Sequence, residues 1–435
     1  MIVPEPAVLS KPPCTPSEVV DKALERRILL VDCDAFFVQV ARLEDPEGAG
    51  RAPLLIVGGS ATGRGVVTSA SYETRRFGVR SAMPTSQALR LCPDATVVGV
   101  PRGAVGRRSR EVRAALEDLA PVVQAASVDE FYLDLTGTER LFHGETLEET
   151  AWRIRLEVLE RTRISVSLGG GTRRVIAKLA ASFAKPAGVH VVPAGREQDF
   201  LNPLELSALP GVGPSLVKSL ERRGLVTVED ALRVQEEWLK RWFGSRRGAW
   251  LYRRVRGVDE SRVDPTDRRK SISSERTFFA DINDDRELED KLMGLATSVA
   301  STLRRKGLRA KTVTVKLRDH DFSTRQHART VPEPVESNAA IVEVAGTLLR
   351  ELRTERRVPA RLLGVGLTGL VSARESHQLG LFDEPVAGET DRDRSVSRVV
   401  DTVADRFGMG AIVPGRLVDR PGDATRRRRP EKDRP

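Results

Sequence analysis

Residues 28–37 read ILLVDCDAFF, and this stretch constrains the fold more than any other part of the chain. Four large apolar residues follow one another without interruption, which is typical of a strand buried on both faces of a sheet. The run then reaches Asp32 and Asp34, whose spacing of two places both side chains on one face of a strand. Phe36 and Phe37 follow at once. A buried strand that ends in two carboxylates predicts a polar site at the edge of a hydrophobic core.

A second acidic cluster occurs in SVDEFYLD at 127–134, where Asp129 and Glu130 stand between apolar residues. Neighbouring residues of a strand point to opposite faces, so both could serve one site only at a bend or a strand end. Charged carboxylates in apolar surroundings are costly unless a cation lies among them, and hard oxygen ligands select Mg²⁺ or Mn²⁺. Two such ions, about 3.5–4 Å apart, are the usual device for in-line phosphoryl transfer.

The alternative is that these acids are ordinary strand-end residues paired with nearby arginines. A lone Asp-x-Asp pair would favour that interpretation. The second acidic pair, in an equally apolar setting, favours a two-metal site instead.

Candidate phosphate ligands follow in SASYETRRFGVRSAMP at 69–84, which brings Tyr72, Arg75 and Arg76 together. A tyrosine hydroxyl and the planar fork of an arginine both suit phosphate oxygens. Lys185 in FAKPAG is a further candidate. The alternative is a solvated basic helix face, which is where such runs usually lie.

The glycine motif LPGVGP at 209–214 indicates a backbone clamp for phosphate. Gly211 and Gly213 bracket a tight turn, and Pro214 suits the first position of the helix that follows. Backbone N–H groups at such a turn point outward at an anion. The pattern is typical of a helix–hairpin–helix, which grips DNA phosphates without reading bases. A plain helix turn with glycine caps is the alternative.

HQLGLFDE at 377–384 is a short segment with apolar residues in an otherwise polar region. Leu379, Leu381 and Phe382 have no obvious core to join, so they suggest a peptide that docks into a pocket on a partner.

Composition is consistent with a nucleic-acid partner. The chain has 435 residues, enough for two to four domains, and a net charge of +10 that favours a polyanion. Three cysteines without a CxxC pattern and five scattered histidines complete no zinc site and fit a reducing compartment. Residues 1–26 lack a signal-peptide core, and no apolar run reaches membrane-span length. We expect a soluble, intracellular protein.

Strand-like and helix-like segments alternate from Arg27 to about Val192, which predicts an α/β or α+β domain. Residues 203–257 have a helical pattern, and 275–371 again mix both types. The expected strands are 28–31, 53–59, 65–72, 95–100, 127–137, 164–171, 275–280, 311–319 and 362–371; the expected helices are 107–119, 147–162, 172–184, 285–305 and 338–354. Beyond Ser372 the polar composition predicts disorder.

The chain resembles Y-family translesion DNA polymerases, of the bacterial DNA polymerase IV (DinB) branch. The resemblance rests on six motifs in the family's order: VDCDAFF, SASYETRRFGVRSAMP, SVDEFYLD, FAKPAG, LPGVGP and RRKSISSERTF. The resemblance covers about residues 27–372 and implies an α+β multidomain right-hand fold. Its implied parts are a flexible leader (1–26), a ferredoxin-like palm (27–36 and 101–190), small fingers (37–100), a helical thumb with the helix–hairpin–helix (191–260), a linker (261–270), an α/β little finger or polymerase-associated domain (271–372) and a mostly disordered tail with a clamp-binding motif (373–435).

The resemblance also assigns roles at the acidic site. Asp32, Asp129 and Glu130 match the family's catalytic metal carboxylates, and the backbone carbonyl of Cys33 completes one metal site. Phe37 matches the steric gate, whose ring excludes a ribose 2′-OH. In this reading Asp34 is structural.

Further contacts are implied outside the metal site. Tyr72, Arg75 and Lys185 match the family's triphosphate contacts, while Gly211 and Gly213 would meet DNA phosphates. QLGLF resembles the peptide by which bacterial polymerases bind the sliding clamp, and its expected contacts are Gln378, Leu379, Leu381 and Phe382.

Three residues depart from the family pattern. Ala35 and Cys33 are small where relatives often carry larger side chains, and Phe131 is bulky where a small residue is common. Each could alter the fit around the incoming nucleotide.

The implied function is an error-prone, low-processivity DNA polymerase that adds dNTPs to a primer 3′-OH opposite a DNA template, without proofreading, in DNA damage tolerance and mutagenesis. Two Mg²⁺ ions per active site are expected, for which Mn²⁺ can substitute. Expected partners are primer–template DNA, dNTPs and the sliding clamp (the replicase β subunit), and we expect a cytoplasmic, nucleoid-associated monomer. The rivals are a non-catalytic DNA- and clamp-binding adaptor of the same fold and a nucleotidyl cyclase. The intact carboxylates argue against the first, and the helix–hairpin–helix and clamp-like peptide against the second.

Overall fold

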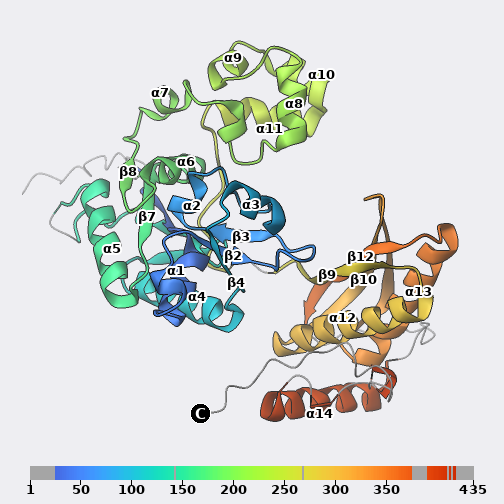
Figure 1. The fold of residues 1–435 in the computed structure, drawn as a ribbon. Helices are drawn as coiled ribbons and strands as arrows, with labels where there is room; N and C mark the ends of the chain where they lie inside the picture. Colours follow the sequence, from blue (N-terminus) through green and yellow to red (C-terminus); the bar gives the residue numbers. More distant parts are fainter. Residues whose placement is uncertain are drawn as a thin grey trace, which may run out of the picture. The chain divides into compact units, whose positions relative to one another are not determined.

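The computed structural model describes residues 25–141, 144–266, 269–374, 389–408, 411–412 and 415–417 (Figure 1). The chain forms two compact units. The first unit comprises Met1–Gly58, Val67–Ala82 and Leu91–Thr266, and the second comprises Gly59–Val66, Met83–Arg90 and Asp267–Pro435. The expected palm and thumb lie in the first unit and the expected little finger in the second. Residues 37–100, the expected fingers, contribute to both, so the domain boundaries stay a prediction.

A five-stranded sheet organises the first unit, in the order β5-β6-β1-β7-β8. Strand β1 (Ile28–Cys33) is central and runs antiparallel to β6 (Glu130–Asp134) and β7 (Val166–Gly171). The edges are β5 (Val122–Ala125) and β8 (Val189–Val191). The unbroken apolar run of β1 therefore lies where a sheet buries both of its faces.

Helices cover both faces of this sheet (Figure 1). Leu29 and Val31 pack with α4 (Arg102–Glu117) and α5 (Leu147–Thr162) on one face. Ile28 and Leu30 pack with α6 (Arg174–Ala184) on the other. Since side chains alternate along a strand, the next residue on the α6 side is Asp32.

Helix α6 approaches the sheet closely because of a glycine. A Cβ on Gly169 of β7 would lie 2.0 Å from the backbone nitrogen of Ala181, so any larger residue would push the helix away. The close approach holds α6 beside the end of β1.

The residues expected to form the fingers include a small sheet of order β3-β2-β4. Its strands are β2 (Leu55–Gly58), β3 (Val67–Ala70) and β4 (Thr96–Val98). The same stretch also contains helices α1 (Phe36–Glu44), η1 (Ala49–Arg51), α2 (Tyr72–Arg75) and α3 (Thr85–Leu91).

The expected thumb is helical, as the sequence pattern predicts. Its elements are α7 (Glu197–Leu201), η2 (Leu206–Ala208), α8 (Pro214–Glu221), α9 (Val228–Leu232), α10 (Glu236–Phe243) and α11 (Ser245–Val255). One apolar cluster joins these helices to α6, through Val175, Ile176 and Leu179.

The second unit is built on a four-stranded antiparallel sheet of order β11-β10-β12-β9. The strands are β9 (Ser271–Ile282), β10 (Leu308–Asp319), β11 (Thr324–Val335) and β12 (Ala360–Ser372). Helices α12 (Asp285–Arg305) and α13 (Asn338–Glu355) pack on the sheet around one apolar core.

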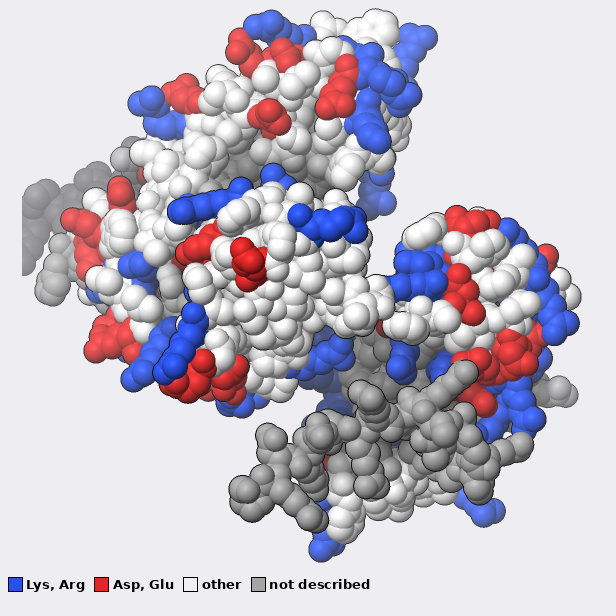
Figure 2. All heavy atoms as spheres, in the orientation of Figure 1, with Lys and Arg blue, Asp and Glu red and all other residues white. Residues whose placement is uncertain are grey.

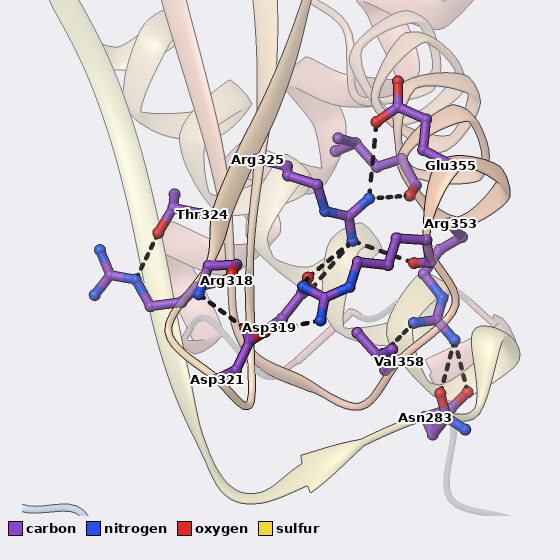
Figure 3. Close-up of polar contacts among 12 residues, drawn as sticks. Asn283, Arg318, Asp319, Asp321, Thr324, Arg325, Arg353, Glu355 and Val358 are labelled. Atoms are coloured by element: carbon purple, nitrogen blue, oxygen red, sulfur yellow. Dashed lines mark hydrogen bonds and ion pairs between the residues drawn. The ribbon is translucent and has the colours of Figure 1, made fainter.

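Arginine side chains connect the elements at one end of this second unit (Figure 3). The fully buried carboxylate of Asp319 accepts hydrogen bonds from Arg325 at 3.1 Å and Arg356 at 3.0 Å. Arg353 binds Asp285 and the Val358 carbonyl. The network joins the β10–β11 hairpin to the end of α13, and its ions satisfy one another.

The polar region beyond Ser372 differs from the expected disorder over 391–407, which form α14 (Asp391–Phe407). Thr390 caps this helix in a capping box with Asp393. Polar contacts dock it on the second unit: Arg304 binds Asp401 at 2.7 Å, and the Asn338 N–H donates to Ser397. Because α14 is docked by polar contacts, its sequence shows no apolar periodicity that would predict a packed helix. Composition alone therefore predicts disorder for these residues. A short turn, η3 (Gly415–Leu417), is also described.

Within the described residues, no helix combines the length and the apolar composition that crossing a bilayer needs.

Candidate active site

Three carboxylates meet where the central strands of the first unit end. Asp32 lies directly opposite Glu130 in the β1–β6 register. Asp129 immediately precedes β6, and its carbonyl accepts a 2.9 Å hydrogen bond from the Cys33 N–H. Adjacent residues of a strand can serve one site only at a bend or at the end of the strand. Asp129 lies at the end of β6, so Asp129 and Glu130 meet this condition.

Each of these carboxylates has a partner from the chain. Lys185 Nζ lies 2.6 Å from Asp32 Oδ1, and Lys178 Nζ lies 2.7 and 2.6 Å from the two oxygens of Glu130. Ser127 donates to Asp129 Oδ1 at 2.5 Å. The sequence analysis finds Lys185 but misses Lys178. A usable signal existed, because Lys178 lies on α6 about two turns before Lys185, which directly follows the last residue of that helix.

Opposing effects act on the charge of the Asp32 carboxyl. Burial raises the pKa of the Asp32 carboxyl, the charges of Glu130 and Asp129 raise it further, and Lys185 opposes them. Burial likewise raises the pKa of the Cys33 thiol well above its usual value, so the backbone carbonyl of Cys33 is its available hard ligand.

The residues therefore fit a divalent metal by chemistry, since they are hard oxygen donors whose mutual repulsion a dication would offset. No group of three or more acidic, histidine or cysteine side chains in the described part of the chain is, however, arranged as a metal site.

Asp34 does not join this cluster. Its buried carboxylate accepts four hydrogen bonds: from Tyr72 Oη at 3.1 Å, Ser165 Oγ at 2.9 Å, Ser167 Oγ at 2.7 Å and the Ala187 N–H at 3.0 Å. A carboxylate with four donors is satisfied within the protein. It ties α2 and β7 to the chain after α6, consistent with the structural role expected for it.

The two phenylalanines after β1 differ in burial. Phe36 is 1% exposed and packs in the sheet core, whereas Phe37 is only partly buried. The two rings meet edge to face at 6.0 Å. Ala35 caps α1 with φ +42°, a left-handed conformation in which a small side chain is least strained.

The expected triphosphate contacts lie beside the carboxylates. Lys185 reaches Asp32, and Tyr72 reaches Asp34 through its hydroxyl. Arg75 donates from Nε to the Ala70 carbonyl, and its guanidinium lies 4.9 Å from the Tyr72 ring centroid. Phe131, by contrast, is buried in the core with α4 and α5, on the sheet face away from Asp32. Its bulk is thus accommodated by packing.

The thumb motif has the expected glycine geometry. Gly211 has φ +98°, and a Cβ there would lie 2.6 Å from the Trp250 ring, so the site requires glycine. Gly213 faces open space and precedes Pro214 at the first turn of α8. Figure 2 shows Lys and Arg side chains gathered on the surface of the helical segment of the first unit. The exposed basic residues of this segment are Lys218, Arg222, Arg223, Arg233, Arg241, Arg246 and Arg247.

The expected clamp peptide, with Gln378, Leu379, Leu381 and Phe382, lies outside the described residues.

Comparison with known proteins gives consistent results over most of the chain. Residues 31–182 match the impB/mucB/samB family, residues 269–381 match its C-terminal domain, and residues 207–259 match the thumb domain of DNA polymerase-iota. The DNA polymerase IV of Desulfatibacillum aliphaticivorans is 37% identical over 91% of this chain and 97% of its own. That of Caulobacter vibrioides is 37% identical over 89% and 93%.

Comparison with solved structures also finds Y-family DNA polymerases. A Y-family DNA polymerase chimera, Dbh-Dpo4(243-245)-Dbh, is similar with a TM-score of 0.72 and 26% identity, covering 80% of this chain and 99% of its own. An insertion ternary complex of Dbh DNA polymerase is similar with a TM-score of 0.57, 26% identity and coverage of 80% and 99%.

Proposed function

The chain belongs to the impB/mucB/samB family and, within it, to the DNA polymerase IV branch of the Y family, and from this premise we propose that Asp32, Asp129 and Glu130 form the centre at which it extends a primer. The enzyme is a DNA-directed DNA polymerase of the translesion type. The observation that carries the site assignment is the cross-strand pair of Asp32 and Glu130, with Asp129 at the same strand end.

In the proposed reaction the primer 3′-OH attacks the α-phosphate of a dNTP in line, and pyrophosphate leaves. Asp32, Asp129, Glu130 and the Cys33 carbonyl would hold two Mg²⁺ ions, replaceable by Mn²⁺, which would activate the hydroxyl and neutralise the triphosphate. The protein contributes mainly position and charge.

The remaining side chains orient the nucleotide. Lys185, Tyr72 and Arg75 bind the triphosphate, with the Tyr72 hydroxyl held in place by Asp34. Phe37, partly exposed beside the end of β1, blocks a ribose 2′-OH. Gly211 and Gly213 let backbone N–H groups of the thumb approach a DNA phosphate.

Partners and setting follow from the same proposal. Gln378, Leu379, Leu381 and Phe382 bind the sliding clamp, which compensates for low processivity. The enzyme works as a monomer in the cytoplasm, on nucleoid DNA, and it synthesises with low fidelity and no proofreading.

Primer extension on a defined template tests this function. The protein should add templated dNTPs with Mg²⁺, stop with EDTA, and leave the primer at full length when dNTPs are withheld. DNA binding without any extension would contradict the proposal and favour the non-catalytic adaptor.

A further inference from the structure

Two lysine ammonium groups form ion pairs with carboxylates of the candidate active site. Helix α6 presents Lys178, and Lys185 follows its last residue. Lys178 bridges both oxygens of Glu130 at 2.7 and 2.6 Å, and Lys185 lies 2.6 Å from Asp32. All four side chains are partly buried, so solvent screens these pairs less than it screens a surface pair.

Asp129 differs from its two neighbours. Its carboxylate accepts from the Ser127 hydroxyl and, within the described part of the chain, makes no ion pair. Two of the three candidate metal ligands are therefore paired with a cation from the protein, and one is not. This division follows from where α6 lies, because Asp32 and Glu130 both face that helix.

We propose that Lys178 and Lys185 are resident counter-ions of the catalytic carboxylates, which neutralise Glu130 and Asp32 until a divalent cation displaces them. The inference rests on the proposed function, which makes these carboxylates metal ligands. Lys178 is then a positioning residue, because it acts on the reaction only through Glu130. The burial that raises the pKa of Asp32 explains why an uncompensated charge at this place would be costly.

The arrangement couples metal binding to nucleotide binding. Lys185 has two alternative anionic partners, Asp32 and the triphosphate of the nucleotide. When the triphosphate draws Lys185 away, Asp32 becomes available to a metal, and by linkage the metal strengthens nucleotide binding equally. The site would thus bind free divalent cations weakly and fill when nucleotide arrives.

Mn²⁺ binding to the full-length protein, without DNA or nucleotide, tests the inference. Free Mn²⁺ is followed by electron paramagnetic resonance. Lys178→Met and Lys185→Met should each bind Mn²⁺ more tightly than the unaltered protein, by about 5- to 150-fold for a typical coupling between sites.

A matched control is Arg174→Met, which removes the same charge from the same helix one turn before Lys178. The Arg174 guanidinium contacts the Arg262 carbonyl and the Tyr132 ring instead of the carboxylates. Its Mn²⁺ affinity should stay near that of the unaltered protein. Equal tightening in this control would show a general charge effect and overturn the inference.

Thermal unfolding without metal checks that each variant is folded, and Lys178→Gln is the second variant should methionine fail. Unchanged or weaker Mn²⁺ binding in a folded Lys178 variant overturns the inference. Primer extension by the unaltered protein is measured alongside. If the unaltered protein extends primers but the Lys178 variant binds Mn²⁺ with unchanged affinity, only this inference is contradicted. If the unaltered protein extends no primer, the proposed function is contradicted.

Discussion

At the scale of single residues, Asp32 and Asp34 show what residue spacing can and cannot predict about a site. Their separation of two residues predicts a shared face and one common metal site. The structure instead gives Asp34 four donors, from residues at 72, 165, 167 and 187. Donors this distant in sequence come together only through tertiary folding, so no local pattern could reveal them. The resemblance to the polymerase family assigns the two aspartates different roles, and the four donors of Asp34 agree with a structural role for it.

Removing the Asp34 carboxylate should destabilise the first unit. Asp34 is 4% exposed, and Asp34→Ala would leave four donors without this acceptor, among them the buried Ser167 hydroxyl. We expect the free energy of unfolding to fall by roughly 3–5 kcal/mol, as for a buried, hydrogen-bonded charge that loses its partner. Urea unfolding measures this. Asp118→Ala, at a side chain that is 71% exposed, is the control and should change it by about 0.5 kcal/mol or less. Equal stability of the two variants would show that Asp34 is not a structural anchor.

Phe37 carries the proposed discrimination between sugars. Phe37→Ala removes the ring that would meet a ribose 2′-OH, so ribonucleotide incorporation should rise relative to dNTP incorporation. Primer extension with matched rNTP and dNTP series gives the ratio of kcat/KM values. Phe36→Ala is a poor control because Phe36 lies in the core; dNTP incorporation by the Phe37 variant itself reports whether the site is intact. An unchanged ratio would remove Phe37 as the gate.

At the scale of elements, strong periodicity predicts well. The helix expected at 147–162 has those bounds in α5, and the expected strands 28–31 and 164–171 match β1 and β7 within two residues. Strand β11 was missed because it is an edge strand, polar and interrupted by two prolines. Helix α14 was missed for a related reason. Its docked side carries Ser397 and Asp401, which have no hydrophobic signature.

The docking of α14 should depend on one ion pair. The side chains of Arg304 and Asp401 are 6% and 15% exposed, and breaking such a pair typically costs roughly 3–5 kcal/mol. Asp401→Asn should therefore release 391–407, seen as faster amide hydrogen exchange. Asp391→Asn, at an exposed acid of the same helix, should leave exchange unchanged. Slow exchange in the Asp401 variant would contradict this account of docking.

Acid should release the same helix. Burial raises the pKa of Asp401, but the hydrogen bond and charge of Arg304 outweigh it and the net pKa is lowered. A lowered folded-state pKa stabilises the docked form above the unfolded value, about 3.9, and this stabilisation is lost as pH falls through the lowered pKa. The protection factors of the α14 amides, which correct for the pH dependence of intrinsic exchange, should fall below about pH 4 and stay constant near neutrality.

At the scale of the whole molecule, the order of motifs was the most informative feature. Six motifs in family order predicted the fold and function that the comparisons support. The α+β organisation, the helical thumb and the mixed little finger follow from the sequence. The pairing of Lys178 and Lys185 with the carboxylates does not, because it depends on how closely α6 approaches Gly169.

The proposed binding to the sliding clamp concerns the whole enzyme rather than its chemistry. Leu381→Ala with Phe382→Ala should abolish stimulation of primer extension by the sliding clamp and spare synthesis without it, because both residues follow in sequence the segments expected to form the palm and thumb. Extension on long primed templates, with and without clamp, measures the difference. Full stimulation of the double variant would exclude QLGLF as the clamp contact.

The central claim is that Asp129 and Glu130, with Asp32, hold the catalytic metals. It is tested most directly by primer extension with the double variant Asp129→Ala and Glu130→Ala, in protein shown to bind primer–template DNA as the unaltered enzyme does. The account predicts that extension falls to background while DNA binding persists. Extension at the rate of the unaltered enzyme would contradict it.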